Sequence, residues 1–364
     1  MAAVGYMIST DFFVKSFESY YSQGVNAFQV FVTPGHNGLG GTKLEANKSK
    51  QIREWMADKH VKCFVHGKFI YNFCRKQCSH HIDQLVHELE LANDIGCDVI
   101  IHQGKNVAVE GLSRLEALNN YVTHVSEVLS RTFDLSNGIL LENSSRQGTE
   151  LGHSLDELIY IYNQFDDDLK PRIGFCIDLC HLFVAGELDL RKKANTEAFF
   201  EKFDKLVGYD KLKCIHFNDS SIPFNGANDH HGDICCGYIS NPLLGGSIEG
   251  FQSLSVIAGQ KGIPIIFETP SLFNNDQLEW QVKIVREWMN GNNQSYLDYY
   301  HTYPNINQIS YDYYNTKGHK LNNTNPCCHD KSDTVVVSKV EIIKKDEIIK
   351  KDDHKMKIKI KLKE

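Results

Sequence analysis

The chain has 364 residues, of which 41% are apolar, and it carries a formal net charge of −7 at pH 7. This length suffices for one large barrel of about 250 residues plus an extension. The sequence contains no run of about 18 apolar residues, which excludes a membrane span. The segment from Met1 to Ser9 is too short and uncharged for a signal peptide, so we expect an intracellular protein, in the nucleus or the cytoplasm.

Short apolar runs recur along the chain and predict eight β-strands, at residues 5–9, 27–32, 61–66, 98–102, 138–142, 172–178, 212–217 and 263–268. Segments with helical spacing of apolar residues alternate with them, at residues 80–95, 112–129, 155–165, 196–207 and 277–288. This alternation is typical of parallel βα units, and eight units predict a closed (β/α)₈ TIM barrel. An open doubly wound sheet is the alternative, but no glycine-rich phosphate fingerprint follows the first strand.

The composition shifts after Gly291 to Asn, Tyr, Lys and Asp. We therefore predict a barrel domain at residues 1–290 and a polar, Lys-rich, partly disordered extension at residues 291–364. Lysines alternate with apolar residues from Lys355 to Lys363, which allows an edge strand, although we favour a mobile basic tail that holds phosphates weakly. The Asn-, Lys- and Ile-rich tail suggests an AT-rich coding genome, such as that of a large DNA virus. If the source is a virus, the site of viral replication is the expected compartment.

The eleven cysteines are irregularly spaced, and several lie inside apolar runs, which favours buried reduced thiols. A disulfide between Cys74 and Cys78 is therefore not expected. Cys327-Cys328-His329 resembles a metal-binding fragment, but it has no second cluster and carries little weight.

Side chains that bind divalent metal stand at or next to the ends of six predicted strands: His66, His102, Glu142, Asp178, His216 and Glu268. The C-terminal ends of barrel strands converge on the face where active sites form, so these side chains should meet there. Three further candidates follow in loops: His181, Asp229 and His231. Nine imidazole and carboxylate ligands are too many for one ion and suit two or three. The ligand types favour Zn²⁺, with Mn²⁺ or Fe as substitutes.

A centre of two or three ions can activate a water near neutral pH and hold the oxygens of a phosphodiester. A metal-dependent sugar isomerase or epimerase would also place Glu, Asp and His at strand ends, around one or two metals. That chemistry does not require the third ligand set. A non-catalytic DNA-binding barrel is a further alternative, disfavoured because all nine ligands are present.

Five motifs carry the later ligands. They are Leu141-Glu142-Asn143 with Gln147-Gly148, the segment CIDLCHLFVAG from Cys176 to Gly186, His216-Phe-Asn-Asp-Ser220, Asp229-His230-His231 and Ile266-Phe-Glu268-Thr-Pro270. In order and spacing these resemble the LEN…QG, CIDTCHxFAAG, HLNDS, DRH and LETP motifs of the endonuclease IV family (AP endonuclease family 2). The resemblance covers about residues 5–290, and the tail lies outside it.

The resemblance implies three zinc ions. His66, His102 and Glu142 would hold one, the shared Glu142 with Asp178, His216 and Glu268 a second, and His181, Asp229 and His231 a third. It further implies hydrolysis of duplex DNA on the 5′ side of an abasic site, which leaves a 3′-hydroxyl and a 5′-deoxyribose phosphate. The abasic nucleotide must leave the helix to reach the site. Glu142 and Glu268 are the expected catalytic residues, with Glu142 orienting the nucleophile, and blocked 3′ ends are a further expected substrate of a monomeric enzyme.

The resemblance also gives the substrate-facing positions, which are Asn72, Phe69, Gln147, His230 and His36. Several depart from the family pattern. Phe69 stands where the family has tyrosine, His230 replaces the arginine of DRH, and the loop that ends at His36 lacks the family's Asn-Gln-Arg wedge. Cys235 and Ser240 replace glycines in the loop after His231. The expected metal centre is intact, whereas the contacts to the duplex should differ, and the basic tail is expected to compensate.

Overall fold

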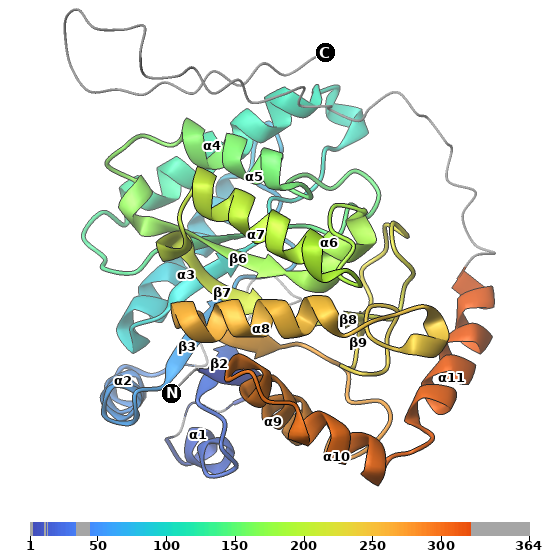
Figure 1. The fold of residues 1–364 in the computed structure, drawn as a ribbon. Coiled ribbons are helices and arrows are strands. Elements are labelled where there is room, and N and C mark those ends of the chain that lie inside the picture. Colours follow the sequence, from blue (N-terminus) through green and yellow to red (C-terminus); the bar gives the residue numbers. More distant parts are fainter. Residues whose placement is uncertain (1–2, 11, 13, 34–43, 322–364) are drawn as a thin grey trace, which may run out of the picture. The chain divides into compact units, whose positions relative to one another are not determined.

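The computed structural model describes residues 3–10, 12, 14–33 and 44–321 (Figure 1). Three features of the sequence predictions lie outside these residues: His36, Cys327-Cys328-His329 and the Lys-rich tail. The chain divides into two compact units, Met1–Gly318 and His319–Glu364.

Eight parallel strands close into a barrel, which confirms the predicted TIM-barrel fold (Figure 1). They are β1 (Val4–Met7), β2 (Ala27–Val30), β3 (Lys62–His66), β4 (Asp98–Ile101), β5 (Ile139–Glu142), β6 (Ile173–Asp178), β7 (Leu212–His216) and β10 (Ile265–Phe267). The strands follow one another around the barrel in chain order, and β10 closes it by pairing with both β7 and β1. Each overlaps a predicted strand, because runs of Ile, Val, Leu and Phe are the signature of strands covered on both faces.

Helices cover the outside of the barrel (Figure 1). They are α1 (Val14–Tyr21), α2 (Ala46–Lys59), α3 (Ser79–Ile95), α4 (Arg114–Arg131), α5 (Leu155–Gln164), α6 (Leu179–Ala185), α7 (Lys193–Leu206), α8 (Glu249–Lys261) and α9 (Gln277–Met289). Single 3₁₀ turns occur at Ala108–Glu110, Lys170–Arg172, Tyr209–Lys211 and Pro242–Leu244. The start of α4 is fixed by a capping box, in which the Ser113 hydroxyl accepts from the Glu116 amide and the Glu116 carboxylate accepts from the Ser113 amide.

One layer of small and large side chains fills the barrel interior, made of Ala3, Ala27, Phe64, Ile100, Leu140, Cys176, Cys214 and Ile266. Cys176 and Cys214 lie opposite each other on β6 and β7, and both are free and fully buried. Cys74 and Cys78 are also free thiols. The layer lies two residues before His66, His102, Glu142, Asp178, His216 and Glu268 on their strands. Since side chains alternate along a strand, those six residues point to the same interior, one level nearer the C-terminal end.

The helical structure continues past the predicted domain boundary at residue 290. Two helices follow α9, namely α10 (Gln294–Thr302) and α11 (Ile306–Leu321), and the first compact unit ends only at Gly318. Aromatic side chains of these helices are buried, with Tyr299 fully covered and Tyr314 only 3% exposed. The division into a barrel domain at residues 1–290 and an extension at residues 291–364 stays a prediction.

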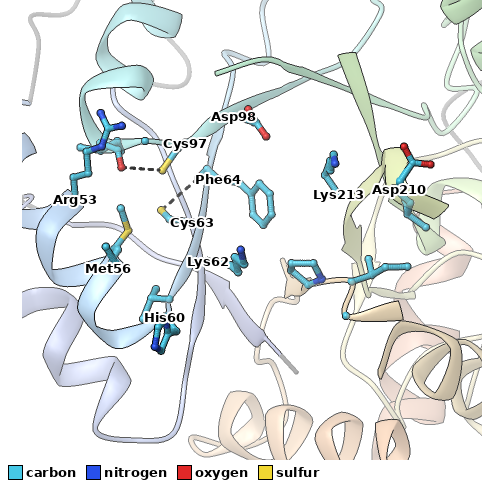
Figure 2. Close-up of a pocket in the computed structure, with 18 of the residues that line it drawn as sticks. Arg53, Met56, His60, Lys62, Cys63, Phe64, Cys97, Asp98, Asp210 and Lys213 are labelled. Atoms are coloured by element: carbon cyan, nitrogen blue, oxygen red, sulfur yellow. Dashed lines mark hydrogen bonds between the residues drawn. The ribbon is translucent and has the colours of Figure 1, made fainter. Parts of the chain in front are cut away.

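A cavity of about 650 Å³ opens at the N-terminal ends of the strands, where Lys62, Asp98 and Leu212 begin β3, β4 and β7 (Figure 2). It lies at the opposite end of the barrel from the predicted metal ligands. In barrels of this type that end contributes stability, and active sites form at the other.

Candidate metal centre

The six strand-end residues converge at the C-terminal mouth of the barrel. His66, Glu142, Asp178 and His216 are the last residues of β3, β5, β6 and β7, while His102 and Glu268 directly follow β4 and β10. Glu142, Asp178 and His216 are fully buried. The strand-end rule therefore brings the predicted ligands together at the mouth.

Glu142 lies at the centre of the first group. Its Oε2 atom is 3.4 Å from the Nε2 atom of His66 and 3.4 Å from that of His102. The His66 ring is oriented by its other nitrogen, since Nδ1 lies 2.7 Å from the Gly67 carbonyl oxygen. Ligand atoms of these three residues all lie within 4.8 Å of one another, a spacing that one ion can span.

The second group joins the same glutamate to three further residues. Glu142, Asp178, His216 and Glu268 offer ligand atoms within 4.8 Å of one another. The Nδ1 atom of His216 lies 2.8 Å from Oε1 of Glu142 and 3.1 Å from Oε2 of Glu268. Glu142 thus uses one oxygen in each group, which is the arrangement that a carboxylate bridging two ions requires.

The third group differs in part from the predicted trio. His181 and His231 share a group with Asp178, while Asp229 falls in a group with His231 and Cys180. Asp229 still contacts both rings, since its Oδ1 atom is 3.2 Å from Nε2 of His181 and 3.3 Å from Nε2 of His231. Asp178 therefore stands between the second and third groups.

Several polar atoms of the site are buried without a hydrogen-bond partner, among them Glu142 Oε2, His181 Nε2 and His231 Nε2. Such atoms are costly unless something pairs with them. A divalent cation would satisfy all three, because a carboxylate oxygen and a deprotonated imidazole nitrogen both donate a lone pair to metal. The donor set therefore fits metal ions.

In this site, the ionisation state of each carboxyl and imidazole group depends on its charged neighbours. Burial opposes ionisation of Glu268, but the adjacent His216 lowers the pKa of its carboxyl to about 2. Burial also opposes charge on His231, yet Asp178 and Asp229 raise the pKa of the ring to about 9. Without cations, Asp178 and Asp229 thus retain a proton on His231. Bound cations would replace that proton.

Three amide side chains orient the ligands, and none of them was predicted to do so. Gln29 on β2 accepts from Nε2 of His216 at 2.7 Å and donates to Oε1 of Glu268 at 2.6 Å. The Asn143 side chain accepts a hydrogen bond from the backbone amide of Asp178 and donates one to the backbone carbonyl of Asp178. The backbone carbonyl oxygen of Asn143 lies 2.8 Å from His181 Nδ1. Asn218 donates to Oδ2 of Asp178 and accepts from the Glu268 amide. Gln29 could have been found as a polar residue within an apolar strand.

We expect Gln29→Ala to weaken metal binding about 10–100-fold, because partners that fix a ligating histidine commonly have effects of this size. The substitution leaves His216 Nε2 without an acceptor and frees the Glu268 carboxylate to rotate. Competition against a chelator of known affinity measures the change. Gln51→Ala on the exposed face of α2 is the matched control, and equal metal affinity in both variants would contradict the assigned role.

The residues predicted to contact substrate lie in different settings. Phe69 is 47% exposed, and its ring centroid is 4.9 Å from that of His66 and 5.4 Å from that of Phe31. Gln147 and His230 are exposed beside the mouth, in the loops that follow Glu142 and precede His231. Asn72 bonds to backbone, since its Oδ1 accepts from the amides of Cys74 and Lys105. Its contacts therefore shape two loops of the rim.

Two short strands in the loop after β7 were not predicted. They are β8 (Asp219–Ser220) and β9 (His231–Gly232), which pair antiparallel. The pairing returns the chain to the mouth and delivers Asp229 and His231 beside His181. Two-residue strands carry no periodic signal in a sequence, whereas the candidate ligands could be named from their residue types and motifs.

Among the helices of the described ranges, none is long and apolar enough to cross a membrane.

The family model for the xylose isomerase-like TIM barrel of AP endonuclease family 2 matches residues 17–244. A protein of Acanthamoeba polyphaga mimivirus named as a putative endonuclease 4 is 32% identical over 289 residues, covering 76% of this chain and 88% of the relative.

Solved structures share the fold. The crystal structure of an endonuclease IV from Thermus thermophilus has a TM-score of 0.64 at 20% identity, covering 79% of this chain and 99% of that one. A D-tagatose 3-epimerase-like protein has a TM-score of 0.57 at 20% identity, covering 80% and 97%. The barrel alone therefore does not separate the two chemistries. The family match over more than half of the sequence, together with the 32% identical relative, shows that this chain belongs to the endonuclease IV family.

Proposed function

We propose that this protein is a monomeric DNA-repair enzyme that hydrolyses the phosphodiester on the 5′ side of abasic sites in duplex DNA. The products would carry a 3′-hydroxyl and a 5′-deoxyribose phosphate, and blocked 3′ ends would be a second substrate. Three zinc ions would serve the reaction, with Mn²⁺ as a substitute. The observation that carries the proposal is the set of nine candidate ligands at one mouth, in which three buried polar atoms have no hydrogen-bond partner.

When bound, the ions would supply an activated water and positive charge against the phosphate oxygens. The protein's own side chains would hold the ions and orient the reacting groups. Glu142, with one oxygen toward His66 and His102 and the other toward His216, would fix the positions of two ions relative to each other. Glu142 would also orient the attacking water, and Glu268, which stays ionised at neutral pH, would be the second catalytic carboxylate beside it.

The third ligand group favours this reaction over sugar isomerisation. His181, Asp229 and His231 lie in mutual contact beyond the two groups that share Glu142. Isomerisation of a sugar needs one or two ions, whereas a phosphodiester has several oxygens to neutralise. Bound cations would also offset the net charge of −7 where a phosphate has to approach.

The test is incision of a duplex that contains one tetrahydrofuran abasic analogue, labelled on the damaged strand, beside the same duplex without damage. We expect a single cut directly 5′ of the analogue, a 3′ end that a DNA polymerase extends, and loss of cutting on chelation. Equal cutting of undamaged duplex, or no incision with saturating zinc, would overturn the proposal. Epimerisation of a ketose by the same preparation would instead favour the sugar reaction.

Phe69 is expected to contact the displaced nucleotide or a neighbouring base. An exposed aromatic ring beside His66 offers a stacking face, and stacking of one base is worth about 1–3 kcal/mol. Phe69→Ala should therefore raise KM for the abasic duplex about tenfold with little change in kcat. Phe133→Ala removes a ring that is 82% exposed just after the end of α4 and serves as the matched control. A fall in kcat at unchanged KM would contradict a role in substrate binding.

A further inference from the structure

We propose that helices α10 and α11 position the metal centre by holding the loop of residues 233–241 (the 233–241 loop), and through it His231. The family match ends at residue 244, so both helices lie beyond it. Figure 1 shows them on the side of the barrel where β8 and β9 emerge. The inference rests on the proposed function only in treating His231 as a metal ligand.

Direct hydrogen bonds join the two helices to the 233–241 loop. The Tyr300 hydroxyl on α10 contacts the Cys235 carbonyl oxygen at 3.4 Å and Oδ1 of Asn307 at 3.0 Å. The Asn241 side-chain amide donates to the Asn307 carbonyl oxygen at 3.0 Å and to the Ser310 hydroxyl at 2.9 Å on α11. Asn241 and Ser310 are both buried, so these bonds are shielded from competing water.

The same helices also cover the loop that follows Glu268. Phe273 in that loop packs edge-on against Tyr313 and Tyr314, with centroids 5.5 and 5.8 Å apart. The Asp233 carboxylate accepts from the amides of Ser271 and Leu272, both at 2.8 Å, and so ties the two loops together. Support by α10 and α11 thus reaches the loops of two predicted ligands.

The 233–241 loop has a conformation that needs this support. Cys235 has φ 75°, a left-handed backbone that residues other than glycine seldom adopt. On the inner side, the Asp219 carboxylate accepts from the amides of Gly237 and Ile239. Asp219 fixes one side of the loop, and α10 with α11 fix the other.

Only Gly232 separates His231 from this loop, and these two residues form β9, which pairs with Asp219–Ser220. A shift of the loop would therefore move the His231 ring, whose Nε2 lies 3.3 Å from Asp229 and 3.6 Å from Asp178. Metal ligation tolerates little displacement, because metal–nitrogen distances are confined to about 2.0–2.1 Å for zinc. The two helices consequently act on metal retention without touching the metal ligands.

The test compares the full-length protein with Tyr300→Phe/Ser310→Ala, which removes hydroxyls from both helices and leaves the loop sequence and the ligands intact. The control is Gln294→Ala/Gln308→Ala, on exposed positions of the same helices. In metal-free protein, we expect amide hydrogen exchange across residues 233–241 to become about tenfold or more faster in the first pair only. In zinc-loaded protein, transfer of zinc to a chelator should accelerate by a similar factor for the most weakly held ion.

Unchanged loop exchange in Tyr300→Phe/Ser310→Ala, or equal acceleration in the control pair, would overturn the inference. Faster loop exchange with unaltered zinc release would refute the link from the loop to His231. Failure of the wild type to incise abasic DNA, with both differences still present, would reject the proposed function and leave this inference standing.

Discussion

Glu142→Gln should reduce incision of abasic-site DNA by at least about 10³-fold, the largest effect expected of any single substitution in this chain. The carboxylate contributes one oxygen to the group with His66 and His102, and the other to the group with His216. The amide would offer one lone-pair oxygen and one NH₂ donor, so it cannot serve both groups. The substitution would therefore weaken the binding of two ions at once. Single-turnover incision of the tetrahydrofuran duplex, with zinc content measured on the same sample, checks this.

The variant needs a folded reference, because Glu142 is completely buried. Glu127→Gln on the exposed part of α4 carries the same change in charge and should keep wild-type activity. Circular dichroism and melting temperature separate loss of the site from loss of the fold. Activity of Glu142→Gln within tenfold of wild type at full zinc occupancy would refute a shared role for Glu142.

The convergence of the candidate ligands could be predicted, because the place of a residue at the end of a barrel strand determines its place in the fold. Each parallel strand ends at the same face, so His66, Glu142 and His216 had to meet once the strands were recognised. The strands were recognisable because they are buried on both faces and therefore continuously apolar. Loops obey no such rule. Asp178 belongs to both the second and the third group of candidate ligands because of the path of the chain from β7 through β8 and β9. The periodicity of apolar residues does not predict that path.

The orienting residues could not be predicted for a related reason. A single Gln or Asn in a strand is compatible with many partners, and only the fold shows that Gln29 reaches both His216 and Glu268. Asn72 is a similar case, since only the fold shows that its side chain bonds to the backbone of Cys74 and Lys105, while its expected contact to substrate stays a prediction. The tyrosine-rich composition of α10 and α11 likewise did not predict that these helices pack beside the 233–241 loop.

Removal of metal should abolish incision and also lower the melting temperature, with the size of the second effect depending on pH. A ligand present at 1,000 times its dissociation constant stabilises the native state by about 4 kcal/mol. At roughly 2–4 °C per kcal/mol, this stabilisation corresponds to a rise in melting temperature of about 10 °C. We therefore expect the zinc-loaded protein to melt clearly above the chelated protein, and re-addition of zinc to restore both stability and incision.

The pH dependence follows from His231, whose pKa in the metal-free protein is raised from 6.5 to about 9. A raised pKa stabilises the native state fully below pH 6.5, and this contribution is lost as the pH rises toward 9. Zinc requires the neutral ring, so its binding becomes more favourable over the same range. The melting temperature of the chelated protein should therefore fall from pH 6.5 to 9, while its difference from the zinc-loaded protein widens. Scanning calorimetry of both forms measures this, and a difference that narrows with rising pH would contradict the assignment of His231 as a ligand. His231→Gln should flatten the pH dependence of the chelated form, because the titrating ring is then absent.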